Sequence, residues 1–163
     1  MIFLTIGSHE PFDRLARALD AWCAARPDAM TVFGQITDHA EYEPTSFEWV
    51  GNLAPDVYLE RCKAATLLVS HAGMGSIITA GQFGKPIVVM PRRAAMRETR
   101  NDHQVATAKR FESRPGVHVA IDEHALPATL DSAIAGLGAA GEAIMGPFAQ
   151  PQLIDAIRAV IHE

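Results

Sequence analysis

The sequence is poor in cysteine, in positive charge and in long hydrophobic runs. Its two cysteines, Cys23 and Cys62, lie far apart without a C-x-x-C motif, which argues against a metal site or a disulfide framework and favours free thiols in a reducing compartment. Lysine and arginine number 14 against 19 acidic residues, a net charge of −5, so a broad nucleic-acid-binding surface is not expected. The opening MIFLTIGSHE lacks the basic start and long apolar run of a signal peptide. These features favour a cytoplasmic protein.

The sequence does have an alternation of short apolar runs with segments of helical periodicity. The apolar runs predict buried strands at residues 2–7, 30–36, 47–51, 65–71, 85–91 and 117–121. The periodic segments predict helices at residues 12–23, 57–64, 76–83, 101–112, 124–137 and 151–161. Because the strands are apolar throughout, they fit a parallel sheet that helices cover on both faces. The predicted fold is α/β, a doubly wound Rossmann-like parallel sheet in one domain over residues 1–163.

The residues directly after the predicted strands are the candidates for a site, because ligands of such sheets bind at the carboxyl ends of the strands. Residues 70–76, after the fourth strand, form the most specific segment. Gly73 and Gly75 let the backbone approach a ligand, and the helix that begins here directs free N–H groups outward. The Ser76 hydroxyl is a further donor. The combination is typical of a diphosphate site, although the same glycines also fit a tight turn that needs them only for its backbone angles.

Two better-known glycine motifs do not fit this turn. A dinucleotide fingerprint needs a third glycine, and this chain has Ile78 in that position. The fingerprint also follows the first strand, whereas this turn follows the fourth. The carboxylate that it requires about 20 residues further on is missing. A P-loop would need glycine in place of Thr79 and a serine or threonine in place of Pro86. A diphosphate site at this turn would therefore belong to neither class.

Two histidines and two arginines also follow predicted strands. His71 lies beside the glycine turn, where a ligand contact and a structural role both stay open. His9 follows the first strand, and a part in proton transfer is equally open there. Arg92 and Arg93 follow the fifth strand, where they either meet phosphate or belong to a solvated loop. The histidines show no metal-ligand spacing, so no protein-bound metal is expected.

Two separated segments together resemble a known enzyme family. The run SHAGMGSIITAGQFGKPIVVMPRRAAMRETRNDHQ, residues 70–104, resembles the donor-binding signature of glycosyltransferase family 28. The opening MIFLTIGSHEPFDRLARALD resembles the start of its short, single-domain members, such as bacterial exopolysaccharide glycosyltransferase subunits of the PssE/EpsE type. The resemblance covers residues 1–121. It implies the C-terminal, nucleotide-sugar-binding half of a GT-B fold, with the acceptor-binding half on a membrane-anchored partner.

The resemblance also implies an activity and a set of site residues. The activity is that of an inverting, UDP-sugar-dependent hexosyltransferase, which acts with its partner at the inner face of the membrane on a polyprenyl-diphosphate-linked acceptor. UDP-sugar is its substrate, and neither a cofactor nor a divalent ion is expected. The general base is expected on the partner, with His9 as the one catalytic candidate in this chain. The matching donor-binding residues are Gly7, Ser8, His71, Gly73, Gly75, Ser76, Asn101, His103 and Gln104.

Position 79 departs from the family pattern. Many members have there a glutamate that holds the ribose hydroxyls, whereas this sequence has Thr79, a shorter and neutral group. Gln82 and Glu98 are alternative ribose contacts, to which the resemblance assigns no role. Two other functions stay open: a UDP-sugar-binding module without independent catalysis, and a UDP-sugar epimerase-like domain. The identity of the transferred sugar and of the acceptor cannot be read from the residues.

Overall fold

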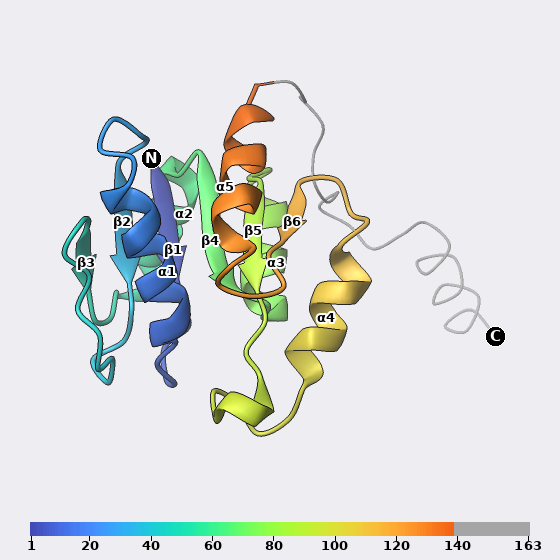
Figure 1. Ribbon diagram of the computed structural model, residues 1–163. Helices are drawn as coiled ribbons and strands as arrows, with labels where there is room; N and C mark the ends of the chain where they lie inside the picture. The colour runs from blue at the N-terminus through green and yellow to red at the C-terminus, as the bar shows by residue number, and fades with distance from the viewer. Residues whose placement is uncertain (139–163) are drawn as a thin grey trace.

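All strands in residues 1–138, the part of the chain that the computed structural model describes, belong to one parallel sheet. They are β1 (Ile2–Thr5), β2 (Val32–Gln35), β3 (Glu48–Val50), β4 (Leu67–His71), β5 (Ile87–Met90) and β6 (Val117–Val119). Their spatial order is β3-β2-β1-β4-β5-β6 (Figure 1). The order reverses between β1 and β4, which is the switch point at which ligands of doubly wound sheets bind.

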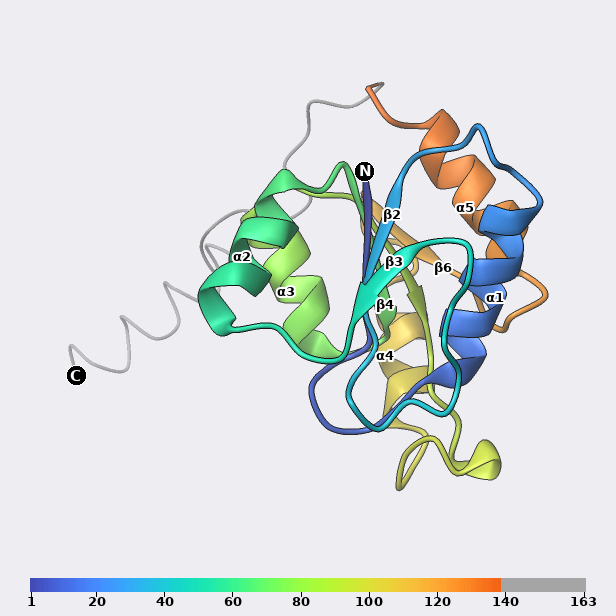
Figure 2. The same ribbon diagram turned by 90° about the vertical axis from the view of Figure 1, so that its left-hand side faces the viewer.

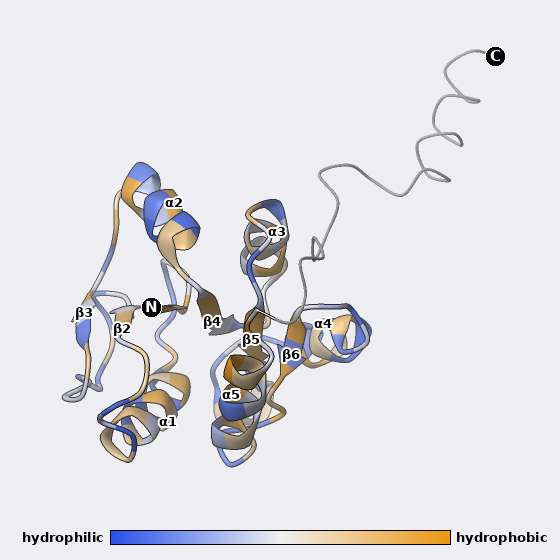
Figure 3. Ribbon diagram, turned by 90° about the horizontal axis from the view of Figure 1, so that it is seen from above, coloured by the Kyte–Doolittle hydropathy of each residue, from blue (hydrophilic) through white to orange (hydrophobic). Residues whose placement is uncertain are grey.

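The helices cover both faces of this sheet. They are α1 (Asp13–Ala24), α2 (Pro55–Ala64), α3 (Met74–Gln82), α4 (His103–Phe111) and α5 (Leu126–Ala135), with a short 3₁₀ helix, η1 (Ala94–Met96), in the loop after β5. Helices α1 and α5 lie together on one face and α2 and α3 on the other (Figures 2 and 3). The predicted doubly wound Rossmann-like fold is confirmed.

Alternate side chains of the central strands supply two separate cores. Leu4 of β1 packs with Leu15 and Leu19 in the core beneath α1 and α5, whereas its neighbour Phe3 packs with Ile77 in the core beneath α2, α3 and α4. Strands β1, β2 and β5 are buried along their whole length. Burial on both faces explains why these strands read as unbroken apolar runs in the sequence.

The element boundaries differ from the predicted ones by a few residues. Strand β1 ends at Thr5, although the apolar run continues through the buried Ile6, because loop residues also pack into the core. Helix α2 begins at Pro55, two residues before the predicted start, and the expected loop at 92–100 contains η1. The uncharged stretch 64–84 is the end of α2, β4 and α3, and no helix within residues 1–138 is long and apolar enough to cross a bilayer. The helix predicted at 151–161 lies outside the described residues.

Candidate functional site

A pocket of about 380 Å³ opens at the carboxyl edge of the sheet, around the switch point. The ends of β1, β2 and β4 form its floor, and the segment that joins β3 to α2 closes one side together with α2 and α3. Its lining consists of Thr5, Gly7, Ser8, Gln35, Asn52, Leu53, Pro55, Tyr58, His71, Gly75, Ser76 and Thr79. The topology thus brings together segments that lie up to about half the chain length apart.

The imidazole of His71 lies between two of the predicted glycines. A Cβ built on Gly73 would lie 2.2 Å from His71 Nε2, and one built on Gly7 would lie 3.4 Å from His71 Cε1. Gly7 also has a φ of 91°, a backbone conformation that would be strained in any residue with a side chain. Gly73 therefore makes room for His71, whereas glycine at position 7 suits the positive φ. Gly73 does not line the pocket, and its contact with a ligand stays a prediction.

His71 is neutral at physiological pH. Burial lowers its pKa to about 4, and the positive charge of Arg92 acts in the same direction. A neutral imidazole has one N–H donor and one acceptor nitrogen. His71 can therefore offer the pocket a hydrogen bond but no positive charge.

The N-terminus of α3 borders the pocket through Gly75 and Ser76. A Cβ built on Gly75 would meet no atom within 4 Å, so the backbone of this first turn faces open space. Ser76 is 7% exposed, and its hydroxyl lies 2.8 Å from that of Ser70, which donates at 2.7 Å to the carbonyl oxygen of Thr5. This chain of hydroxyls ties the first turn of α3 to β1. The result is a rigid helix N-terminus whose N–H groups can hold an anion.

Arg92 is a structural residue, and neither role proposed for it from the sequence is right. Its side chain is 3% exposed, so it belongs to no solvated loop. Its guanidinium donates to the carbonyl oxygens of Ile6 at 2.8 Å, Glu10 at 2.7 Å and Pro11 at 2.5 Å. These bonds hold the loop after β1 against the loop after β5. Arg93 also donates to a carbonyl oxygen, that of Ile121, at 2.8 Å.

A second arginine, Arg14 of α1, also fixes the loop after β5, and both Arg14 and Arg92 lie against the ring of Phe12. It forms a two-point ion pair with Glu98, with nitrogen–oxygen distances of 2.7 and 2.8 Å, and a further pair with Glu123 at 2.8 Å. The second oxygen of Glu98 also accepts a bond from the Arg93 backbone N–H at 2.9 Å. With its carboxylate held in this way and outside the pocket lining, Glu98 is not placed to hold a ribose.

The segment at the start of α4 lies at the same edge of the sheet but outside the pocket lining. The Asn101 side-chain oxygen accepts a bond from the His103 backbone N–H at 3.1 Å and lies 2.5 Å from His103 Nδ1. Both residues are exposed. Gln104 is 6% exposed, and its side-chain oxygen accepts the Arg92 backbone N–H at 3.1 Å, so it supports the loop after β5. Contact of these three residues with the donor stays a prediction.

His9 stands at the rim of the site. It is exposed, and its Nδ1 lies 2.8 Å from the hydroxyl of Ser8, which does line the pocket. Its catalytic role stays a prediction. Within residues 1–138, no three His, Cys, Asp or Glu side chains come together as ligands for a metal ion. Cys62 is buried and Cys23 half-buried, and neither forms a disulfide.

Two pocket residues, Gln35 and Tyr58, were not singled out from the sequence. Gln35 is 4% exposed, and its amide donates to the carbonyl oxygens of Gly7 at 2.8 Å and Gly51 at 3.2 Å, which joins the loops after β1 and β3. Burial raises the pKa of Tyr58 to about 12, so its hydroxyl stays protonated. A polar residue at the end of an apolar strand was the available signal for Gln35, whereas Tyr58 sits in an ordinary amphipathic helix.

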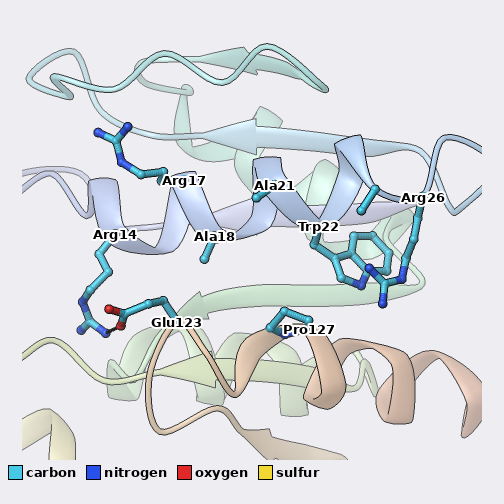
Figure 4. A pocket seen from close by; sticks show the side chains of 9 residues that line it. Arg14, Arg17, Ala18, Ala21, Trp22, Arg26, Glu123 and Pro127 are labelled. Atoms are coloured by element: carbon cyan, nitrogen blue, oxygen red, sulfur yellow. Dashed lines mark hydrogen bonds and ion pairs between the residues drawn. The ribbon is translucent and has the colours of Figure 1, made fainter.

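A larger hollow of about 560 Å³ lies between α1 and α5, on the face away from α3 (Figure 4). Small and apolar side chains form much of its wall. The Arg14, Arg26 and Glu123 side chains are engaged in ion pairs, and Arg17 lies over the ring of Tyr42. Arg14 points toward Glu123, and Arg26 pairs with Asp131 at 2.7 Å. The first turns of α1 and α5 contribute Arg14 and Pro127 to its lining, but within residues 1–138 it is lined by no residue at the carboxyl end of a strand, where ligands of such sheets bind. The smaller pocket at the switch point is therefore the candidate site.

Comparison with known proteins decides the family. The family model described as Glycosyltransferase family 28 C-terminal domain matches residues 1–144. The chain belongs to this family. No curated protein sequence matches this family 28 domain, but solved structures share its fold.

The solved structures are GT-B glycosyltransferases of low sequence identity. The glycosyltransferase of kitacinnamycin is 24% identical, with a TM-score of 0.60, and the match covers 98% of this chain and 37% of that one. MurG of Acinetobacter baumannii is 16% identical, with a TM-score of 0.64 and coverages of 98% and 49%. CalG4, the calicheamicin glycosyltransferase, is 13% identical, with a TM-score of 0.58 and coverages of 99% and 43%. The family 28 domain has the fold of the C-terminal half of a GT-B enzyme and spans less than half the length of each chain.

The family 28 domain gathers part of its predicted donor site in the pocket. The predicted donor residues that line it are Gly7, Ser8, His71, Gly75 and Ser76. Gly73 lies against the His71 imidazole, and Gln104 is bonded to the Arg92 backbone. Asn101 and His103 are exposed and lie outside the pocket lining. Thr79, the departure from the family pattern, lines the pocket one turn of α3 beyond Ser76.

Proposed function

We propose that this family 28 domain binds the UDP-sugar donor of an inverting hexosyltransferase, which transfers the sugar to a polyprenyl-diphosphate-linked acceptor in polysaccharide biosynthesis. The observation that carries the proposal is an open helix N-terminus at the switch-point pocket of a chain of this family. Such a terminus offers several N–H donors and a partial positive charge to an anion. The diphosphate of a nucleotide sugar is an anion of the right kind for it.

The pocket sets the direction in which the donor lies. The diphosphate rests on the first turn of α3, where Gly75 has no side chain to keep it away and neutral His71 supplies a hydrogen bond. The nucleoside extends between α2 and α3, toward Tyr58 and Thr79. The sugar then points to the other side, where Asn101 lies exposed.

Catalysis in this half of the enzyme consists of stabilising the leaving group. Negative charge grows on the diphosphate as the bond to the sugar breaks, and N–H groups that are already aimed at it lower the energy of that state. Because these donors suffice to spread the charge, we expect transfer to continue in the presence of EDTA. The acceptor hydroxyl loses its proton to a base on the partner, with His9 as the candidate in this chain.

A membrane-anchored partner supplies the acceptor side of the cleft in this proposal. The fold corresponds to the C-terminal half of GT-B enzymes, and the match covers 37–49% of their chains. An acceptor with a polyprenyl tail stays in the bilayer, so the partner would hold this domain at the inner face of the membrane. In this proposal the acceptor therefore binds to the partner.

Release of UDP tests the proposal directly. The chain is incubated with UDP-glucose, UDP-galactose, UDP-N-acetylglucosamine or UDP-glucuronic acid, with membranes that contain a candidate partner and acceptor. One donor should give UDP and a labelled lipid product, and only when both proteins are present. Binding of UDP without transfer from any donor would favour a binding module instead. Transfer at full rate by the chain alone would refute the need for a partner.

A further inference from the structure

Among residues 1–138, only neutral groups line the pocket at the switch point. Within the described residues, its polar side chains are the hydroxyls, amides and imidazole of Thr5, Ser8, Gln35, Asn52, Tyr58, His71, Ser76 and Thr79. Tyr58 stays protonated and His71 uncharged at neutral pH. Nucleotide sites that recognise the ribose 2′-hydroxyl commonly use an Asp or Glu carboxylate for it. This lining has no such group.

The nucleoside end of the pocket can be located from the helix geometry. Thr79 lies three positions after Ser76, so both side chains occupy the same face of α3, one turn apart. With the diphosphate on the first turn, the ribose of a nucleotide lies beside Thr79 and faces Tyr58 across the pocket. Both residues offer single hydroxyl groups where a carboxylate would offer two acceptor oxygens.

The amides near this end are already engaged. The Gln35 side chain accepts a bond from the Thr5 hydroxyl at 2.8 Å and donates to two backbone carbonyls. The Asn52 amide donates to the carboxylate of Asp38. Tyr58 lines the pocket together with Thr5 and Thr79, and burial keeps its hydroxyl protonated by raising its pKa to about 12. An additional ribose hydroxyl would therefore compete with bonds that the protein already makes.

We propose that this pocket discriminates only weakly between ribonucleoside and 2′-deoxyribonucleoside diphosphates, so that donors of both kinds belong to its substrate class. The inference rests on the proposed donor site and concerns its specificity. A hydrogen bond between neutral groups contributes about 0.5–1.5 kcal/mol and one to a charged group about 1.5–3 kcal/mol. Loss of the ribose 2′-hydroxyl should therefore weaken binding by up to about tenfold where its partner is neutral, and by more than about tenfold where its partner is charged.

Calorimetry of the full chain with UDP and with 2′-deoxy-UDP tests the inference, since the two ligands differ by one hydroxyl group. We expect dissociation constants that agree within about tenfold. The variant Thr79→Glu adds the missing carboxylate and should raise the preference for UDP by about tenfold or more, whatever it does to both affinities. Thr79→Val keeps the shape and removes the hydroxyl, which should bring the ratio toward one. Thr129→Val, at a helical threonine of α5 outside the pocket, should leave both affinities unchanged.

The outcomes separate this inference from the function on which it rests. If wild type binds UDP but rejects 2′-deoxy-UDP by more than about tenfold, the weak discrimination is refuted and the donor site stands. An unchanged ratio in a folded Thr79→Glu variant would refute the placement of the ribose beside α3. If neither nucleotide binds, the proposed function fails, and the inference with it. Unfolding midpoints show whether each variant is folded, and Tyr58→Phe provides a second removal of a hydroxyl from the same end of the pocket.

Discussion

Replacing Gly75 by aspartate should abolish most of the affinity for UDP without harm to the fold. The Cβ position at Gly75 is open for at least 4 Å, and its φ is not in the positive range that favours glycine. An acidic side chain in the first turn of a helix contributes about 0.3–1 kcal/mol through the helix dipole, and removal of a helical glycine contributes about 0.5–1 kcal/mol. The variant should therefore be as stable as wild type or more stable by about 1 kcal/mol.

The loss in binding follows from the charge at this position. A carboxylate about 5 Å from a phosphate, at an effective dielectric constant of roughly 20–40, is repelled by roughly 2–3 kcal/mol. A repulsion of about 2 kcal/mol corresponds to about a 30-fold rise in the dissociation constant. Because the repulsion is electrostatic and partly exposed to solvent, added salt should reduce it.

Isothermal titration calorimetry with UDP provides the assay, and Gly75→Asn provides the matched control. Asparagine has the size of aspartate without its charge, so we expect this variant to retain affinity within about fivefold of wild type. Uridine, which carries no phosphate, should bind both variants alike. Unchanged UDP affinity in Gly75→Asp would refute the assignment of the diphosphate to α3. An equal loss in Gly75→Asn would show that the effect is steric.

Three further predictions concern the support of this site. Gly73→Ala must displace the His71 imidazole, since its Cβ would lie 2.2 Å from Nε2, and calorimetry should show UDP binding weakened by about tenfold. The pKa of His71, about 4 in the folded chain against an ordinary 6.5, means that the unfolded chain binds this proton first as the pH falls. Denaturant titrations should show up to about 3 kcal/mol of stability lost between pH 7 and pH 4, and less in His71→Gln. Arg14→Met leaves the half-buried carboxylate of Glu98 without its partner and should cost roughly 2 kcal/mol in unfolding free energy, whereas Arg26→Met, at an exposed ion pair, should cost less than about 1 kcal/mol.

The pattern of apolar residues was sufficient to predict the sheet because every central strand is covered on both faces. A strand in that position has no solvent side, so its sequence is an unbroken apolar run that ends where the chain leaves the sheet. Boundaries were less exact. Ile6 is buried beyond the end of β1, and α2 includes Pro55 and Asp56, the pair that was expected to begin it. Local patterns record burial, and burial does not stop at the last hydrogen bond of a strand.

The carboxyl-edge location of the candidate site was predictable for the same reason, but the roles of several of its residues were not. Arg92 follows a strand and Gln104 lies in the first turn of a helix, as ligand-binding residues do, yet both are buried and bonded to backbone atoms of loops. The pair of Arg14 with Glu98 joins residues 84 positions apart. Such contacts depend on which strands are neighbours, and no spacing along the chain reveals that.

The helix N-terminus after β4 has one feature that could be predicted from the residues and one that could not. The residues alone predict that a glycine turn leads from a buried strand into α3, because backbone chemistry and hydrophobic periodicity act over a few residues. The role of each glycine depends on the folded chain: Gly73 makes room for the side chain of His71, and Gly75 leaves open space at the pocket. A glycine acts here through the group that occupies the space of its absent side chain. The packing of the whole sheet determines which group that is.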